Sequence, residues 1–139
     1  MLVLDTNHLV EFDLASAYGA ALKRRLASAQ EELATTIVCA EEQLRGWLAQ
    51  ISRIKDPLML FEPYARLGAR LEFFAEWNVL PWDAAAASHF IALRSAKVRI
   101  GTADLRIASI VLANNATLLT RNIKDFSKIP GLQVEDWLS

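Results

Sequence analysis

The sequence predicts an α/β fold in which a central parallel sheet of four to five short strands is flanked by helices on both faces. Short apolar runs such as Leu2–Leu4 and Leu33–Thr36 alternate with longer segments whose apolar residues recur at helical spacing. The chain has 139 residues and is 53% hydrophobic but only 22% charged. These values suit one globular domain over residues 1–139 that buries a sizeable core.

In the first half of the chain, turn and capping residues separate the predicted elements. Leu2–Leu4 is a buried strand that ends in the polar turn Asp5-Thr6-Asn7 and opens into a loop. A helix from about Ala15 to Gln30 and a strand at Leu33–Thr36 follow. Thr36 is then the predicted N-cap of the next helix. The predicted buried face of that helix comprises Ile37, Ala40, Leu44, Trp47, Leu48 and Ile51.

In the second half, proline, aspartate and asparagine mark the boundaries. Asp56-Pro57 interrupts the helical pattern, and a further helix with a kink near Pro63 runs to about Trp77. Asp83 is the predicted N-cap of an alanine-rich helix that reaches Ala96. The remaining predicted elements are a strand at Val79–Leu80, a helix from about Ala103 to Ala113 ended by Asn114-Asn115, a strand at Thr117–Thr120, a polar turn and a last strand near Leu132–Val134.

Charge and cysteine content restrict the class of protein. The net charge of −1 does not by itself indicate a nucleic-acid-binding protein, although a small total can hide local basic patches. Cys39 is the single cysteine, so no intrachain disulfide is possible and a reducing compartment is expected. The chain lacks the features of a signal peptide and has no apolar run of about 20 residues. We therefore expect a cytoplasmic protein that does not enter the membrane.

Acidic and amide residues follow the predicted strands at the places where this fold class forms sites, outside the carboxyl ends of the strands. These residues are Asp5, Glu42, Asp104, Asn122 and Asp125. Several carboxylates cannot all ionise in one cleft without a cation, because like charges a few ångströms apart repel strongly. A set of oxygen ligands without His or Cys suits Mg²⁺, with Mn²⁺ as a substitute, and does not suit zinc.

Each of these acids also has an ordinary structural role open to it. Asp5 can stabilise a turn, and Asp104 can complement the dipole of the helix that it begins. Glu42 can be a solvated helix residue, and its neighbour Glu41 competes for any role assigned to it. Asp125 can cap the turn before Phe126. The prediction of a metal site therefore depends on the whole set.

The same residues lie in segments that resemble PIN-domain proteins, specifically the VapC toxins of bacterial toxin–antitoxin operons. The matching segments read LVLDTNHLVEF, TTIVCAEEQLRG, WDAAAASHFIALRS and IGTADLRIASIVLANNATLLTRNIKDFSKIPGLQVEDW. The ordered motifs are DTN, E-x-x-x-G, D-x-x-I-A and T-R-N-x-x-D-F-x-x-I-P-G-L. The resemblance covers nearly the whole chain, and Asp56–Trp77 is its least distinctive stretch.

The resemblance implies a PIN-like fold and a Mg²⁺-dependent endoribonuclease that cleaves tRNA or rRNA to inhibit translation. Asp5 matches the first acidic metal ligand and Asp104 the central one. Glu42, four residues before Gly46, matches the second acid better than Glu41 does. The fourth acidic position falls on Asn122, which leaves open whether Asp125 supplies the missing charge. The resemblance also implies a cognate VapB-like antitoxin whose C-terminal segment covers the site, and a homodimer.

From these parts we infer a mechanism in which Asp5 and Asp104 hold the principal ion and Glu42 binds a second ion or orients the attacking water. Thr6, Thr120 and Asn122 would position ligands or substrate, and Arg121 and Lys124 are candidates for phosphate contact. His8 lies near Asp5 in the sequence, but we do not expect it to act as an acid–base group, and His89 is expected to be structural. Exposed apolar residues within Leu22–Leu33 and Trp47–Phe74 are candidates for partner contacts.

Two other functions are open at this stage. A phosphatase of the HAD-like class also begins with a strand ending in aspartate, but it generally carries a second aspartate where this chain has Asn7. A PIN-like module that binds RNA or protein with an impaired active site is favoured slightly by Asn122 and opposed by the three acids that remain.

Overall fold

The computed structural model describes residues 1–14 and 16–139, and Ala15, where the second predicted element begins, lies outside the described residues. The five strands form one sheet in the order β3-β2-β1-β4-β5, and all four strand pairings are parallel. The strands are β1 (Leu2–Leu4), β2 (Leu33–Thr36), β3 (Val79–Leu80), β4 (Thr117–Leu119) and β5 (Gln133–Glu135). The predicted parallel α/β sheet is confirmed, with β1 at its centre.

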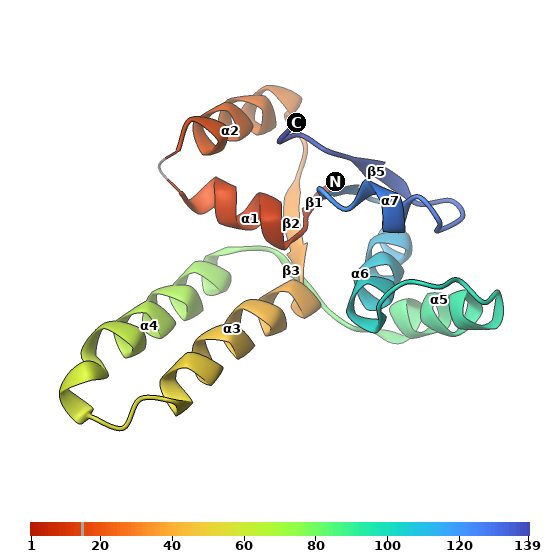
Figure 1. The fold of residues 1–139 in the computed structure, drawn as a ribbon. Helices are drawn as coiled ribbons and strands as arrows, with labels where there is room; N and C mark the ends of the chain where they lie inside the picture. The colour runs from red at the N-terminus through yellow and green to blue at the C-terminus, as the bar shows by residue number, and fades with distance from the viewer. Residues whose placement is uncertain (15) are drawn as a thin grey trace.

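Helices lie on both sides of this sheet. Figure 1 shows α1 and α2 on one side of it, α6 and α7 on the other, and α3 and α4 projecting together away from its strands. The helices are α1 (Thr6–Asp13), α2 (Ala17–Ala29), α3 (Ile37–Ser52), α4 (Phe61–Glu76), α5 (Ala84–Ser95), α6 (Thr102–Ala113) and α7 (Ile123–Phe126), with a short 3₁₀ turn at Pro57–Met59. Within the described part of the chain, no helix is long and apolar enough to cross a membrane.

The core forms around the central strands, whose side chains are buried on both faces. Leu4 of β1 and Leu119 of β4 are fully buried and occupy the same register position in neighbouring strands. Ile107 and Ile110 of α6 and Phe126 of α7 are also fully buried. Because β1 and β4 end together inside this core, the residues that follow them begin at a partly buried edge of the sheet.

The first polar turn is where the sequence prediction was wrong. A helix, α1, begins at Thr6, and Asp5 is its N-cap, with a side chain that accepts a hydrogen bond from the Thr6 N–H at 2.8 Å. Aspartate is among the best N-caps because its carboxylate satisfies a backbone N–H that has no partner in the first helical turn. A second short helix, α7, likewise replaces the polar turn predicted after β4. Both errors arise because Asp and Asn favour turns and N-caps alike.

The helix pair α3–α4 departs from the prediction in another way. Ile37 and Leu48 belong to the predicted buried face of α3, yet they are 44% and 55% exposed. The two helices project from the sheet, so much of α3 has only α4 to pack against (Figure 1). The kink predicted near Pro63 is absent from the continuous helix α4, because Pro63 lies in its first turn, where no N–H is required.

Two predicted helix starts are confirmed by their caps. Thr36 Oγ1 accepts a hydrogen bond from the Cys39 N–H at 3.1 Å, and Asp83 Oδ1 accepts one from the Ala86 N–H at 2.9 Å. The last strand begins one residue later than predicted, at Gln133. Asn115 adopts a left-handed conformation with φ of 50°, as the prediction for the end of α6 requires.

Candidate metal-binding acidic site

Three carboxylates converge near the carboxyl ends of the central strands. Asp5 follows β1, Glu42 lies in the second turn of α3 after β2, and Asp104 lies in the first turn of α6. Asp5 is only 9% exposed, whereas Glu42 and Asp104 are half-buried. The acidic cluster, as we call these three residues, therefore brings together positions that are 37 to 99 residues apart in the sequence.

Asp5 is held by three hydrogen bonds from different parts of the chain. Its Oδ1 accepts the Thr6 N–H at 2.8 Å and faces the Cys39 thiol sulfur at 3.6 Å. Its Oδ2 accepts the Thr120 hydroxyl at 2.7 Å. The same hydroxyl oxygen accepts the Asn122 N–H at 3.0 Å, which orients the hydroxyl hydrogen toward Asp5. The Asp5 carboxylate is therefore fixed in position by its surroundings.

Asn122 joins the acidic cluster to Asp125. Its Nδ2 atom donates to Asp104 Oδ2 at 3.3 Å and to Asp125 Oδ2 at 3.2 Å. Lys128 approaches the other oxygen of Asp125 at 3.5 Å. Asn122 therefore lies between Asp104 and Asp125, and Asp125 lies at the more exposed edge of the acidic cluster.

Burial and mutual repulsion perturb the acids. Burial raises the pKa of Glu42, and the nearby carboxylates of Asp5 and Asp104 raise it further, although the hydrogen bond from Thr6 at 3.2 Å opposes this. The pKa of Asp104 is raised by burial, Asp5 and Asp125, against the hydrogen bond from Asn122. The pKa of Asp125 is instead lowered, chiefly by the hydrogen bond from Asn122 and also by Lys128 and Lys124.

The donor set fits a divalent cation that prefers oxygen ligands. None of the ion pairs formed within residues 1–14 and 16–139 includes Asp5, Glu42 or Asp104. Their negative charge therefore lacks a protein counter-ion, which a bound cation would supply. The side chains do not form a closed cage, because among the described residues no three acidic, histidine or cysteine side chains lie close enough to one another to hold an ion unaided. Such an open arrangement suits Mg²⁺, which usually keeps several water ligands.

The other predicted site residues lie in different environments. Thr6 and Thr120 contact the acidic cluster, whereas Arg121 is exposed, as is Lys124. His89 lies on α5, as expected, and its side chain is exposed. His8 is fully buried, and its Nε2 accepts the Trp137 N–H at 3.1 Å.

His8 is therefore engaged with the C-terminal segment, and none of its described hydrogen bonds reaches the acidic cluster. Burial lowers its pKa from 6.5 to about 4, although Asp136 and Asp5 act in the opposite direction. The ring is neutral near pH 7. This environment agrees with the expectation that His8 does not act as an acid–base group.

Cys39 is the contact that sequence reasoning missed. Burial raises the pKa of its thiol to about 12, and the adjacent Asp5 adds to this, so the sulfur keeps its proton. Cys39 and Glu42 are three residues apart in α3 and so lie on the same helix face. That spacing, combined with the N-cap at Thr36, was the signal in the sequence that could have found it.

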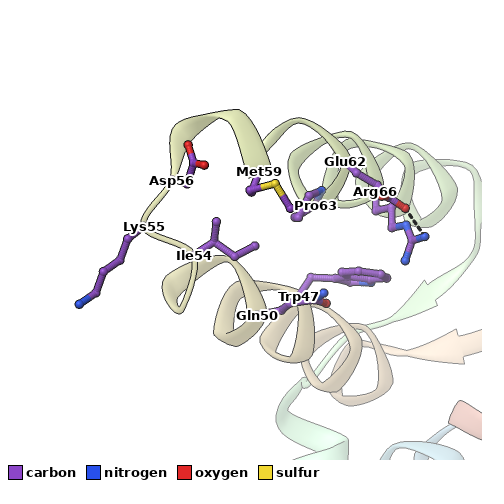
Figure 2. Close-up of a pocket in the computed structure, with 9 residues that line it drawn as sticks. All are labelled: Trp47, Gln50, Ile54, Lys55, Asp56, Met59, Glu62, Pro63 and Arg66. Atoms are coloured by element: carbon purple, nitrogen blue, oxygen red, sulfur yellow. Dashed lines mark hydrogen bonds and ion pairs between the residues drawn. The ribbon is translucent and has the colours of Figure 1, made fainter.

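A groove of about 380 Å³ begins at Glu42 and runs between α1, α3 and α4. Its lining combines apolar and polar side chains, namely Val10, Asp13, Leu14, Glu42, Gln43, Gly46, Trp47, Gln50 and Arg70. A second hollow of about 470 Å³ shares Trp47 and Gln50 with it and lies between the distal parts of α3 and α4. Figure 2 shows the Trp47 ring facing the Glu62–Arg66 ion pair there, with Met59 and Ile54 farther out. The two hollows form a path that leads away from the acidic cluster.

Comparisons with known proteins agree on one family. The sequence profile described as "PIN domain" matches residues 2–132. Ribonuclease VapC2 of Rickettsia felis is 58% identical over 38 residues, which are 27% of this chain and 28% of that protein. The tRNA(fMet)-specific endonuclease VapC of Salmonella typhimurium is 33% identical over 69 residues, which are 47% of this chain and 52% of that protein.

The matched segments thus span about a quarter and about half of the length of these two relatives. Among solved structures, VapBC-1 from nontypeable Haemophilus influenzae superimposes with a TM-score of 0.73 and 25% identity. That alignment covers 99% of this chain and 98% of the other.

Proposed function

Because this chain belongs to the PIN domain family, we propose that it is a divalent-metal-dependent endoribonuclease and the toxic member of a toxin–antitoxin pair. The observation that carries the proposal is the acidic cluster, whose three converging carboxylates take part in none of the ion pairs found in the described part of the chain. The relatives named as ribonucleases and a tRNA endonuclease support RNA as the substrate. Cleavage of tRNA or rRNA by such an enzyme would inhibit translation.

Asp5 and Asp104 are the residues that would hold the principal ion, with Mg²⁺ as the proposed cation and Mn²⁺ as a substitute. When bound, such an ion lowers the pKa of a water molecule and neutralises charge that develops on the phosphate. Asp5 can serve as a rigid ligand because its three hydrogen bonds fix its orientation before any ion arrives. Rigid ligands avoid the entropic cost of ordering a flexible side chain.

Glu42 would orient the attacking water or bind a second ion. The Thr6 hydroxyl donates to Glu42 Oε2 at 3.2 Å, and no donor among the described residues bonds to Oε1. The raised pKa of Glu42 makes its carboxylate a better proton acceptor than an exposed glutamate would be. Asn122 would take the fourth acidic position as an amide that orients Asp104, while Asp125 adds negative charge at the rim.

RNA would approach over the exposed basic residues near the rim of the cluster. Arg121 follows Thr120 directly and is exposed, and Lys124 lies in the adjacent helix α7. Contacts from such residues to phosphates position a nucleic acid without reading its sequence. The choice between tRNA and rRNA would depend on contacts beyond these residues.

A cognate VapB-like antitoxin would occupy the groove that begins at Glu42. Val10, Leu14 and Trp47 offer apolar contact there, beside the ion pair between Arg70 and Asp13. A peptide segment lying in this path would end beside the acidic cluster and block RNA.

Beyond the groove, the Trp47–Phe74 region exposes several large apolar side chains that no described element covers, namely Leu48, Leu58, Met59, Phe61, Tyr64 and Leu71. Leu22 and Leu26, in the other region predicted to contact partners, are buried core residues.

We also propose that the chain forms a homodimer. Ile91 of α5 is 64% exposed, and Trp82, which precedes that helix, is exposed as well. Only Ala86 and Leu93 of α5 are buried within the described chain. A second copy packed on α5 would cover this apolar surface. Size-exclusion chromatography with light scattering would measure the mass, and a monomer at all protein concentrations would contradict the dimer.

The test of the function is cleavage of RNA by the purified protein. We expect cleavage in Mg²⁺ that stops when EDTA removes the ion, and mapping of new 5′ ends after brief induction in cells would identify the RNA. A phosphatase of the HAD-like class would instead hydrolyse a chromogenic phosphate ester. Binding of Mn²⁺ without cleavage of any RNA tested would favour the alternative of a PIN-like binding module, for which the amide at Asn122 is the supporting observation.

A further inference from the structure

The two oxygens of the Asp5 carboxylate have different surroundings. A carboxylate oxygen can accept about two hydrogen bonds through its lone pairs. Oδ1 has two donors, the Thr6 N–H at 2.8 Å and the Cys39 thiol at 3.6 Å. Oδ2 has one donor, the Thr120 hydroxyl at 2.7 Å. Within the described part of the chain, Oδ2 therefore keeps one lone pair without a partner, whereas Oδ1 keeps none.

We propose that Cys39 is a positioning residue for Asp5, whose thiol occupies Oδ1 and leaves Oδ2 as the single oxygen that faces a divalent cation. Asp5 would then bind the ion through one oxygen and not through both. The proposal rests on the proposed function only in requiring that a divalent ion binds at the acidic cluster.

The position of the thiol is set by the chain around it. Thr36 caps α3 through the Cys39 N–H, so the first turn of α3 fixes the sulfur relative to the strand end. The Thr35 hydroxyl donates to the Leu4 carbonyl at 2.9 Å, which ties β2 to the residue before Asp5. Cys39 is fully buried, and its sulfur contacts Oδ1 of Asp5 instead of packing only against apolar atoms.

The chemistry of the pair makes the thiol the donor. A thiolate beside the buried Asp5 carboxylate would place two negative charges together away from water, so the sulfur retains its proton. Because Glu42 lies one helical turn after Cys39 on the same face of α3, the thiol also links the orientation of Asp5 to the helix that carries Glu42.

The infrared S–H stretching band tests this arrangement directly, because Cys39 is the only cysteine in the chain and gives the only such band. The full chain is measured without metal and with Mg²⁺, alongside Cys39→Ala, which assigns the band by its loss. We expect a lower frequency in the unsubstituted protein than in Asp5→Ala, since a hydrogen bond weakens the S–H bond. If Asp5→Ala does not fold, Asp5→Asn keeps the N-cap and shifts the band in the same direction by a smaller amount.

Addition of Mg²⁺ distinguishes the two oxygens of Asp5. If the ion takes Oδ2, the thiol keeps its bond to Oδ1, and its band moves only part of the way toward the frequency in Asp5→Ala. A band that moves all the way means that the ion has displaced the thiol from Oδ1, and that result would overturn the proposal. An equal frequency in the metal-free protein and in Asp5→Ala would also overturn it.

Mn²⁺ affinity, measured by electron paramagnetic resonance, provides the second readout. Loss of an outer hydrogen-bond partner of a metal ligand typically weakens binding about 10-fold or more, and we expect this for Cys39→Ala. Ser109→Ala is the matched control, because it removes a buried hydroxyl that donates to the Leu105 carbonyl within α6. Unchanged affinity in Cys39→Ala, or an equal loss in Ser109→Ala, would refute a positioning role.

These measurements separate this proposal from the proposed function, since none of them uses RNA. Metal binding with the expected band shifts but without RNA cleavage contradicts the function and supports the role of Cys39. Metal-dependent cleavage combined with wild-type Mn²⁺ affinity in Cys39→Ala contradicts the role of Cys39 and supports the function.

Discussion

The hydroxyl of Thr120 donates a hydrogen bond to Oδ2 of Asp5 across 2.7 Å and joins two strand ends that are 115 residues apart in the sequence. The main chain repeats this connection, because the Asp5 N–H donates to the Leu119 carbonyl at 2.9 Å. The acidic cluster is therefore built on the pairing of β1 with β4. Changes at this junction should affect the proposed metal chemistry more than the fold.

Asp5→Asn should reduce RNA cleavage more than about 100-fold, because it removes the charge of a proposed metal ligand. The fold should persist, since asparagine is as good an N-cap as aspartate and can still accept the Thr6 N–H. A fluorogenic RNA measures cleavage, and thermal unfolding checks the fold. Retained activity in a properly folded Asp5→Asn protein would refute the assignment of Asp5 as a metal ligand.

Thr120→Val should lower cleavage about 10- to 100-fold, because Asp5 loses a donor and the Asn122 N–H loses its acceptor. Thr120→Ser keeps the hydroxyl and is the matched control, so it should stay close to the wild-type rate. The comparison uses initial rates at a fixed Mg²⁺ concentration. Equal rates for the two variants would mean that the hydroxyl does not matter for the reaction.

The raised pKa values of Glu42 and Asp104 predict how stability depends on pH. Between the ordinary pKa of a carboxyl group and the raised pKa in the folded protein, these two groups are protonated more often in the native state than in the unfolded state. Without metal, stability should therefore fall as the pH rises through the raised pKa values. Asp104→Asn should reduce this fall, whereas the exposed-site control Glu72→Gln should not.

Added Mg²⁺ should counteract the same repulsion. We expect it to raise the Tm of the wild-type protein more at pH 7 than at pH 5, and to have little effect on Asp104→Asn. Thermal scans in EDTA and in Mg²⁺ provide the measurement. A Tm of the wild-type protein that does not respond to Mg²⁺ at pH 7 would contradict the proposed site.

His8 should make the opposite contribution to pH dependence. Since burial lowers its pKa from 6.5 to about 4, the native state binds fewer protons between these values. The stabilisation is complete above pH 6.5 and is lost as the pH falls toward 4, with a total of about 3 kcal/mol. His8→Gln does not titrate, so its unfolding free energy in urea should fall less over this range. RNA cleavage by His8→Gln should remain near wild type, and a large loss in a folded variant would give His8 a role in the reaction.

Gly19→Ala should destabilise the protein by about 1–3 kcal/mol, because the new methyl group would overpack the contact between α1 and α2. An added Cβ would lie 2.2 Å from the Glu11 carbonyl oxygen and 2.6 Å from that of Leu14. Gly68→Ala is the control, since its Cβ would meet nothing within 4 Å on α4. That change should stabilise the helix by up to about 1 kcal/mol. If the two substitutions change the free energy of unfolding in urea equally, the close approach at Gly19 does not make alanine unfavourable there.

Local patterns were enough to predict most of the architecture. Strands β1, β2 and β3 match their predicted ranges, and the caps at Thr36 and Asp83 are where the sequence placed them. These features depend on neighbouring residues, so periodicity and capping preference reveal them. The errors at α1 and α7 occur where one residue type serves two local structures with similar frequency.

The pattern of neighbouring residues could not predict which side chains of α3 are buried. The apolar spacing predicts one buried face, but Ile37, at the start of α3, and Leu48, farther along the helix, are both exposed. Periodicity identifies which residues share a helix face, and it does not say what lies opposite that face. The exposed apolar surface is therefore a property of how the helices are arranged in space.

The sequence by itself was enough to predict the kind of chemistry that we propose for the site, because the number and type of oxygen-bearing side chains at strand ends favour one class of cation. Only the tertiary structure decided how those side chains are held: Cys39 and Thr120 meet Asp5 from positions 34 and 115 residues further along the chain, and Asn122 lies between Asp104 and Asp125. The physical reason is that hydrogen bonds act over about 3 Å in space. The bond from Thr120 to Asp5 joins residues that are 115 apart in the sequence, and such a separation leaves no local pattern to detect.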